Sequence, residues 1–93
     1  EARDALVSTN GRKLSELTEE DVIATSSVRR RAQLLKYNPN FNIIDIRGNV
    51  DTRLKKWRNG YCTAMIMAAA GLQRLELDDT ISEIVDVEQI IPA

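Results

Sequence analysis

The sequence contains no histidine and only one cysteine, Cys62, among its 93 residues. The lack of histidine excludes Ser–His and Cys–His catalytic pairs and most zinc sites, so we predict no metal site. A single cysteine excludes an intrachain disulfide and indicates a reducing compartment. Because Cys62 lies between the Asn59-Gly60 turn and an apolar segment, we expect a partly buried structural thiol.

Long apolar runs are missing as well. No run approaches the roughly 20 residues that span a bilayer, and the chain does not open with the basic, apolar and small-residue segments of a signal peptide. We therefore expect a cytoplasmic protein with no membrane partner. Phosphate loops and the GxGxxG and GxSxG motifs are also absent from the sequence, which excludes the common nucleotide-binding and serine-hydrolase signatures.

The net charge of −1 conceals an uneven distribution of charge. Residues 22–74 hold ten Lys and Arg against two acidic residues, whereas the segments on both sides are acidic. A cationic centre predicts an anionic partner. The acidic flanks and the small number of aromatic residues argue against a nucleic-acid partner.

Apolar segments predict four strands, three of which are followed by helical patterns. The strands are expected at residues 5–8, 22–25, 42–46 and 64–68. Helices are expected from Ser26 or Ser27 to about Tyr37, from about Val50 to the Asn59-Gly60 stop, and from Ala69 to about Leu75. Residues 81–87 are predicted to be helical, and residues 90–93 to be a strand cut short.

Helical spacing predicts which side chains of the first two helices face the core: Val28, Ala32 and Leu35 in one, and Val50, Leu54 and Trp57 in the other. A strand–helix order repeated three times indicates crossover connections and a largely parallel sheet. We predict an α/β fold in a single domain over residues 1–93. It has three layers, with a mixed, mostly parallel sheet and helices on both faces.

Hydroxyl, small or arginine residues follow each of these three strands. They are Thr25, Ser26, Ser27, Arg29 and Arg30 at the first strand, Arg47, Gly48, Thr52 and Arg53 at the second, and Ala70, Gly71 and Arg74 at the third. The carboxyl ends of parallel strands share one edge of the sheet, where ligands of open α/β sheets bind. Helix N-termini there offer N–H groups, glycine lets a ligand approach the backbone, and arginine pairs with carboxylates. The sequence therefore predicts a polyanion site at this edge.

Other interpretations stay open at this point. Arg29, Arg30 and Arg31 cannot all point one way, because successive helical residues are ~100° apart, and Arg31 is the one that we expect to face solvent. We expect Lys55, Lys56 and Arg58 on the surface. The main alternative function is a non-enzymatic anion-binding lobe, as in periplasmic receptors or regulator effector domains, because these proteins share the architecture.

Four stretches of the sequence also match the pattern of a known family. They are Arg3-Asp4-Ala5-Leu6-Val7-Ser8, Ala24-Thr25-Ser26-Ser27-Val28-Arg29-Arg30, Arg47-Gly48-Asn49-Val50-Asp51-Thr52-Arg53-Leu54 and Ala68-Ala69-Ala70-Gly71-Leu72-Gln73-Arg74-Leu75. In this order and spacing they resemble porphobilinogen deaminase (hydroxymethylbilane synthase), in its second, middle domain. The resemblance implies a lobe like that of a type II periplasmic binding protein. It also implies an enzyme that condenses four porphobilinogen units into hydroxymethylbilane with release of ammonia, in haem and tetrapyrrole biosynthesis.

The resemblance assigns roles to the residues of the predicted site. The family carries a dipyrromethane cofactor, and its acetate and propionate groups, with those of the growing polypyrrole, would be bound by Arg29, Arg30, Arg47, Arg53 and Arg74. Thr25 and Ser27 would add hydroxyl and backbone contacts. Gly48 would let the ligand approach the backbone, and Ala68 and Gly71 would form close-approach walls.

The family's reacting groups lie outside this sequence. The resemblance places the catalytic aspartate in a first domain before Glu1, and the cysteine that attaches the cofactor in a third domain after Ala93. Cys62 does not match that cysteine. We therefore expect a transferase fragment, inactive alone, whose partners are the other two domains and the polypyrrole. Ala2 and Gln73 stand where the family commonly has Pro and Lys.

Overall fold

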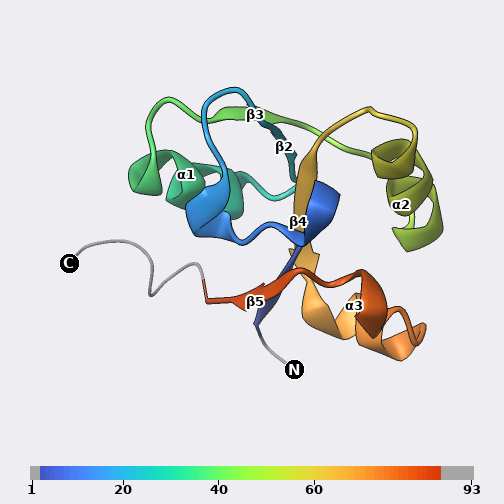
Figure 1. Ribbon diagram of the computed structural model, residues 1–93. Helices are drawn as coiled ribbons and strands as arrows, with labels where there is room; N and C mark the ends of the chain where they lie inside the picture. The colour runs from blue at the N-terminus through green and yellow to red at the C-terminus, as the bar shows by residue number, and fades with distance from the viewer. Residues whose placement is uncertain (1–2, 87–93) are drawn as a thin grey trace.

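The computed structural model describes residues 3–86 and has five strands and three α-helices in this range (Figure 1). The strands are β1 (Asp4–Ser8), β2 (Val22–Ala24), β3 (Asn42–Ile44), β4 (Ala64–Ala68) and β5 (Glu83–Val85). The helices are α1 (Val28–Tyr37), α2 (Val50–Arg58) and α3 (Ala69–Arg74), and short 3-10 turns lie at Thr9–Gly11, Leu14–Glu16 and Asp78–Thr80. The four predicted strands and three predicted helices are confirmed.

The strands form one sheet in the order β3-β2-β4-β1-β5. Strand β2 is parallel to both β3 and β4, whereas β1 is antiparallel to β4 and to β5. Four strands therefore run in one direction and β1 runs against them. The predicted mixed, mostly parallel sheet is confirmed.

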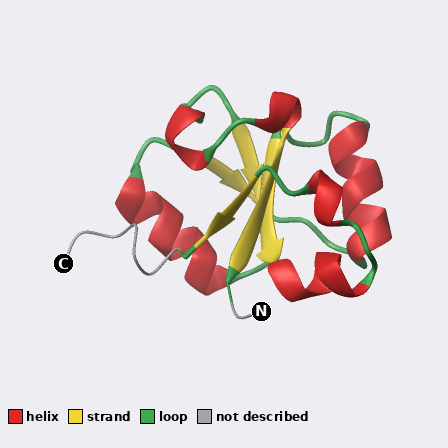
Figure 2. Ribbon diagram, turned by 60° about the horizontal axis from the view of Figure 1, so that its bottom comes forward, coloured by secondary structure: helices red, strands yellow, loops and turns green. Residues whose placement is uncertain are grey.

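Helices cover both faces of the sheet (Figure 2). Leu34 of α1 packs with Leu6, Ile23 and Ile66 on one face, whereas Leu54 of α2 and Leu72 of α3 belong to the cluster on the other face. The chain passes from β2 to β3 in one direction along the sheet and returns past β2 to reach β4. Because crossovers of parallel strands are right-handed, these opposite steps place α1 and α2 on opposite faces.

Polar side chains that directly precede the two longer helices cap their N-termini. The Ser27 hydroxyl accepts a hydrogen bond from the N–H of Arg30, and the Asn49 side chain accepts one from the N–H of Thr52. Each bond satisfies an N–H that the first turn of a helix leaves unpaired. The backbone turns at Gly60, whose φ is +88°, where α2 ends. These local signals place both helix starts at the edge of the sheet where β2 and β3 end.

Two predictions about packing were wrong. Val28 is 84% exposed and Ala32 is also exposed, whereas Leu34 is fully buried. Val28 is the first residue of α1, and the helix contacts the core through the later residues Leu34 and Leu35, the second of which was predicted. The predicted face of α2 is confirmed, because Leu54 is buried and Val50 and Trp57 pack against the same cluster.

Residues 81–87 were predicted to be helical, but Glu83–Val85 form strand β5. The pairing of β5 with β1 gives β1 a neighbour on its second side, and β-branched Ile84 and Val85 suit a strand. The strand predicted at residues 90–93 lies outside the described residues. None of the helices within residues 3–86 is long and apolar enough to cross a membrane.

Candidate anion-binding site

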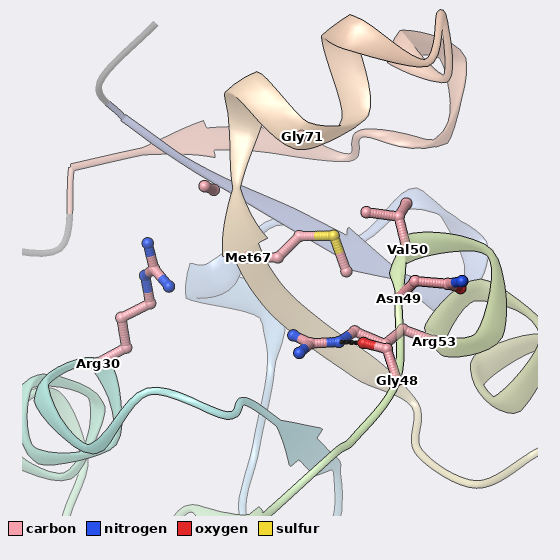
Figure 3. Close-up of a pocket in the computed structure, with 8 residues that line it drawn as sticks. Arg30, Gly48, Asn49, Val50, Arg53, Met67 and Gly71 are labelled. Atoms are coloured by element: carbon pink, nitrogen blue, oxygen red, sulfur yellow. Dashed lines mark hydrogen bonds between the residues drawn. The ribbon is translucent and has the colours of Figure 1, made fainter.

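All three strand–helix junctions line one cavity of about 390 Å³ (Figure 3). Its lining residues are Arg30 from α1, Gly48, Asn49, Val50 and Arg53 from the β3–α2 junction, and Met67, Ala68 and Gly71 from the β4–α3 junction. The convergence of the three junctions, predicted from the parallel strands, is therefore present. Arg30 and Arg53 reach the cavity from opposite sides of β4 (Figure 3). Which of these residues bind a ligand stays a prediction.

Arg53 connects two of the junctions. Its Nε donates a hydrogen bond of 2.7 Å to the carbonyl oxygen of Gly48, and its Nη1 donates one of 3.0 Å to the hydroxyl of Ser26. The guanidinium is thus held at the rim of the cavity by backbone and side-chain acceptors. Two fixed donors orient the planar group without neutralising its charge, so it can still attract a carboxylate.

Glycine is present at positions 48 and 71 of the site for two different structural reasons. Gly48 has a φ of +110°, and a Cβ at this position would lie 2.7 Å from Cγ2 of Thr52. The backbone turn itself therefore requires glycine. A Cβ at Gly71 would meet only Cγ2 of Val50, at an ordinary 3.7 Å, and Gly71 lies inside a helix. Glycine weakens a helix by about 1 kcal/mol relative to alanine, so protein packing does not account for Gly71.

Arg30 already has an anionic partner at the cavity. Its Nη2 lies 2.7 Å from Oδ1 of Asp4, whose side chain is 7% exposed. Asp4 is the strand partner of Ala68, a cavity residue, in the register of β1 and β4. Within the described part of the chain, the buried Nε of Arg30 has no hydrogen-bond acceptor. Asp4 is not among the site residues predicted from the sequence, because its contact with Arg30 joins β1 to α1 and these segments are distant in the chain.

A second, smaller depression of about 210 Å³ lies at the N-terminus of α1. It is lined by Thr25, Ser26, Ser27, Val28, Arg31, Asp45 and Arg47. The Thr25 hydroxyl accepts a hydrogen bond of 3.3 Å from the N–H of Ser27. Arg47 is exposed and pairs with Asp45 through its Nε at 2.6 Å. Ser26 lines this depression and accepts a hydrogen bond from Arg53, which lines the larger cavity.

Arg29 and Arg74 line neither of the two depressions within the described residues. Arg29 is exposed and its Nη1 donates to Oε1 of Gln33, 3.3 Å away. Arg74 is exposed at the end of α3. Arg31 is exposed as predicted, but it lines the smaller depression. Roles for Arg29 and Arg74 in ligand binding stay predictions.

The basic residues of α2 are mostly surface residues, as predicted. Lys55 and Arg58 are exposed, but Lys56 is half-buried. Its Nζ donates to the carbonyl oxygen of Arg47 at 3.1 Å and lies 5.6 Å from the centre of the Tyr61 ring. Lys56 therefore binds the backbone of the β3–α2 junction at its exposed surface.

Cys62 is a buried core residue, so its thiol is more completely buried than the partly buried structural thiol that the sequence predicted. Burial raises the pKa of its thiol to about 11, although a backbone hydrogen bond with Ala64 acts in the opposite direction. The thiol is therefore protonated near neutral pH and is not a nucleophile. Residues 3–86 contain no group of three side chains suited to hold a metal ion.

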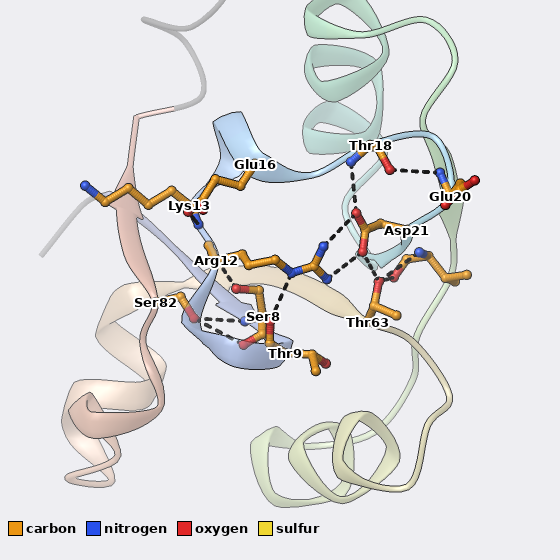
Figure 4. A network of polar contacts seen from close by, with 11 residues as sticks. Ser8, Thr9, Arg12, Lys13, Glu16, Thr18, Glu20, Asp21, Thr63 and Ser82 are labelled. Atoms are coloured by element: carbon orange, nitrogen blue, oxygen red, sulfur yellow. Dashed lines mark hydrogen bonds and ion pairs between the residues drawn. The ribbon is translucent and has the colours of Figure 1, made fainter.

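A second network of charged residues lies at the opposite end of the sheet (Figure 4). Both carboxylate oxygens of Asp21 accept hydrogen bonds from Arg12, at 3.1 and 2.6 Å. The N–H of Thr18 and the hydroxyl of Thr63 also donate to this carboxylate, each at 2.9 Å. Burial alone would raise the pKa of Asp21, but the bonds from Arg12, Thr18 and Thr63 outweigh it and lower that pKa.

Comparison with known proteins agrees with this arrangement. A family profile described as porphobilinogen deaminase, dipyromethane cofactor binding domain, matches residues 1–93. The porphobilinogen deaminase of Roseiflexus sp. (strain RS-1) is 48% identical over 91 residues, and that of Exiguobacterium sibiricum is 47% identical over 94 residues. The protein of the same name from Chlorobaculum parvum is 45% identical over 93 residues.

These alignments cover 98–100% of this chain but 30% of each relative. The chain therefore spans a little under a third of the length of the curated relatives that it matches. The match to the family profile extends over the whole sequence, including all three junctions that line the cavity. By this match and by these identities, the chain belongs to the porphobilinogen deaminase family.

Proposed function

We propose that this chain is the middle domain of a porphobilinogen deaminase and forms the carboxylate-binding half of its active-site cleft. The observation that carries the proposal is the placement of Arg30 and Arg53, from separate junctions, around one cavity with small residues on its wall. In this proposal, the complete enzyme condenses four porphobilinogen units into hydroxymethylbilane and releases ammonia. The other domains supply the catalytic aspartate and the cysteine that attaches the cofactor.

The chemistry of the ligand suits this cavity. Each pyrrole unit carries an acetate and a propionate group, so a growing chain accumulates negative charge. Arginine stays protonated at any working pH and its fork matches a carboxylate. Hydrogen bonds to charged groups contribute about 1.5–3 kcal/mol each, and less in an open, solvated half-cleft. Several arginines are therefore required to hold one polypyrrole.

The residues present fit a dipyrromethane group. When bound, the cofactor supplies the primer to which further pyrrole units are joined. In our proposal, Arg30 and Arg53 hold its carboxylates at the larger cavity, and Ala68 and Gly71 let the pyrrole rings lie close to the backbone. Gly71 supports this role because its missing side chain leaves space that protein packing does not require.

The smaller depression extends the proposed site. Its Thr25 and Ser27, together with Arg47, would bind further carboxylates of the cofactor or of the growing chain. The N-terminus of α1 adds partial positive charge there. Arg29 and Arg74, which line neither depression within the described residues, would act when the polypyrrole extends past the rim. Gly48 would act through the backbone turn that presents Arg53.

The proposal can be tested in the full-length enzyme with a matched pair of variants. We expect Arg53→Ala to raise the KM for porphobilinogen, or to reduce the fraction of protein that carries cofactor, by about tenfold or more, as for the loss of one charge-assisted hydrogen bond. Lys55→Ala removes an exposed positive charge from the same helix and should change neither quantity. Equal behaviour of the two variants would remove Arg53 from the site.

A second test concerns the division of roles between domains. The 93-residue chain, mixed with porphobilinogen, should yield no hydroxymethylbilane, because the groups that handle protons lie in another domain of our proposal. Turnover by the chain alone would contradict this division. Activity of the full-length protein in the same assay would separate the proposal from a purely non-enzymatic anion-binding lobe, which would be inactive at full length as well.

A further inference from the structure

We propose that Asp4 is a positioning residue for substrate binding, because it fixes the guanidinium of Arg30 at the cavity. This inference rests on the proposed function. Asp4 begins β1 and Arg30 lies in the first turn of α1, so the contact joins two segments that are distant in the sequence. The carboxylate oxygen Oδ1 and the guanidinium Nη2 are 2.7 Å apart.

Burial makes this contact stable. The side chain of Asp4 is 7% exposed and that of Arg30 is 20% exposed. If Arg30 moved to a ligand and left Asp4, a buried carboxylate would lose its partner, which is strongly unfavourable. We therefore expect the ion pair between Arg30 and Asp4 to persist when the ligand binds. The remaining N–H groups of Arg30 would then donate hydrogen bonds to the ligand.

The strand register places the pair beside the cavity. Asp4 lies opposite Ala68, which lines the cavity together with Arg30. Arg30 has an unpaired buried Nε within the described part of the chain, so its donors are only partly used. A guanidinium held in place before the ligand arrives loses less conformational entropy on binding. Asp4 thus contributes to affinity without contacting the ligand.

The test measures KM, kcat and the thermal midpoint in the full-length enzyme, with porphobilinogen as the probe. Asp4→Asn keeps the shape of the side chain and removes its charge, so we expect the KM to rise about tenfold while kcat changes less. Arg30→Gln should raise the KM at least as much. The double variant should be no worse than Arg30→Gln alone, because both changes remove the same oriented guanidinium.

Asp21→Asn is the matched control, since it also removes the charge of a buried aspartate paired with an arginine. It should lower the thermal midpoint and leave the KM unchanged. Asp4→Glu retains the charge and displaces the carboxylate by one methylene. The role of Asp4 can therefore be tested with this variant even if Asp4→Asn fails to fold. Its KM should fall between those of the native protein and Arg30→Gln.

Two outcomes would overturn the role of Asp4 while leaving the proposed role of Arg30 intact. In one, the Asp4 variants change only the thermal midpoint, as Asp21→Asn does. In the other, the effects of Asp4→Asn and Arg30→Gln on the KM multiply, which would show that Asp4 acts independently of Arg30. A normal KM for Arg30→Gln itself would overturn the proposed role of Arg30, and the role of Asp4 with it.

Discussion

Two buried aspartate–arginine pairs lie at opposite ends of the same sheet, and they differ in how completely they are satisfied. At one end, Arg12 binds Asp21 through two nitrogens and the carbonyl of Thr9 through its Nε at 3.1 Å. At the other end, Arg30 forms an ion pair with Asp4 through its Nη2 and has a buried Nε without an acceptor in the described residues.

The difference separates a structural network from one prepared for a ligand. In the first pair, each of the three guanidinium nitrogens of Arg12 donates to an acceptor of the chain, and such a connected network stabilises the fold. A partly satisfied arginine at a cavity retains hydrogen-bonding capacity, and an unpaired buried donor is unfavourable until it finds a partner. Burial and charge are similar in the two pairs. The count of satisfied donors therefore distinguishes them better than burial does.

The largest effect on stability is expected from Asp21→Asn. Breaking a buried pair by altering one partner typically lowers the free energy of unfolding by about 3 kcal/mol. The loss can be measured in this chain by urea unfolding, followed by the fluorescence of Trp57. Asp45→Asn is the control, because Asp45 pairs with Arg47 at the exposed surface and such pairs contribute ~0–1 kcal/mol. Equal losses in the two variants would show that the Asp21 network is not a stabilising unit.

The next largest effect is expected from Gly48→Ala. The substitution combines a φ of +110° with a Cβ that lies 2.7 Å from Cγ2 of Thr52, so we expect a loss of about 2 kcal/mol. Gly60→Ala has a similarly positive φ of +88° but no atom within 4 Å of the new Cβ. Gly60→Ala should therefore lower the free energy of unfolding by less than Gly48→Ala does in the same urea experiment. A smaller loss for Gly48→Ala would show that Thr52 moves aside freely.

Gly71→Ala should separate stability from binding. An alanine strengthens a helix by up to about 1 kcal/mol relative to glycine, and its methyl group would meet Val50 at an ordinary 3.7 Å. The same methyl group would narrow the proposed cleft. We expect an unchanged or raised thermal midpoint, with the KM for porphobilinogen in the full-length enzyme raised several-fold. A lowered midpoint with a normal KM would assign Gly71 to packing instead.

The smallest effect on the free energy of unfolding is expected when the pH is lowered, because protonation of Asp21 leaves its hydrogen-bonding oxygens in place. The pKa of Asp21 is lowered below its ordinary value of 3.8 in the folded chain, so the unfolded chain binds the proton first as the pH falls. This contribution to stability is therefore complete above that value and is lost as the pH falls through the folded pKa. Urea unfolding between pH 6 and pH 3, values spanning the aspartate range, should show a steeper decline for the native chain than for Asp21→Asn. If the free energy of unfolding declined equally with pH in the two proteins, the lowered pKa of Asp21 would not be the source of the pH dependence.

Local features of this protein could be predicted from the sequence because their causes are local. Ser27 and Asn49 cap their helices through bonds to residues three positions ahead, and Gly60 lies where α2 ends. The apolar run at residues 64–68 became the central strand β4, which is paired on both sides. The prediction of the inward face of α1 failed at Val28, since spacing alone does not show where a helix leaves the sheet.

The sequence by itself determined the parallel strand–helix units, the helix caps and the gathering of junction residues at one edge, because each follows from short-range patterns and from the direction of the strands. Only the tertiary structure decided that Asp4 meets Arg30, that Arg53 binds Ser26, and that residues 83–85 pair with β1. These contacts join segments far apart in the chain. The order and register of the strands determine them, and these arise when the whole core packs.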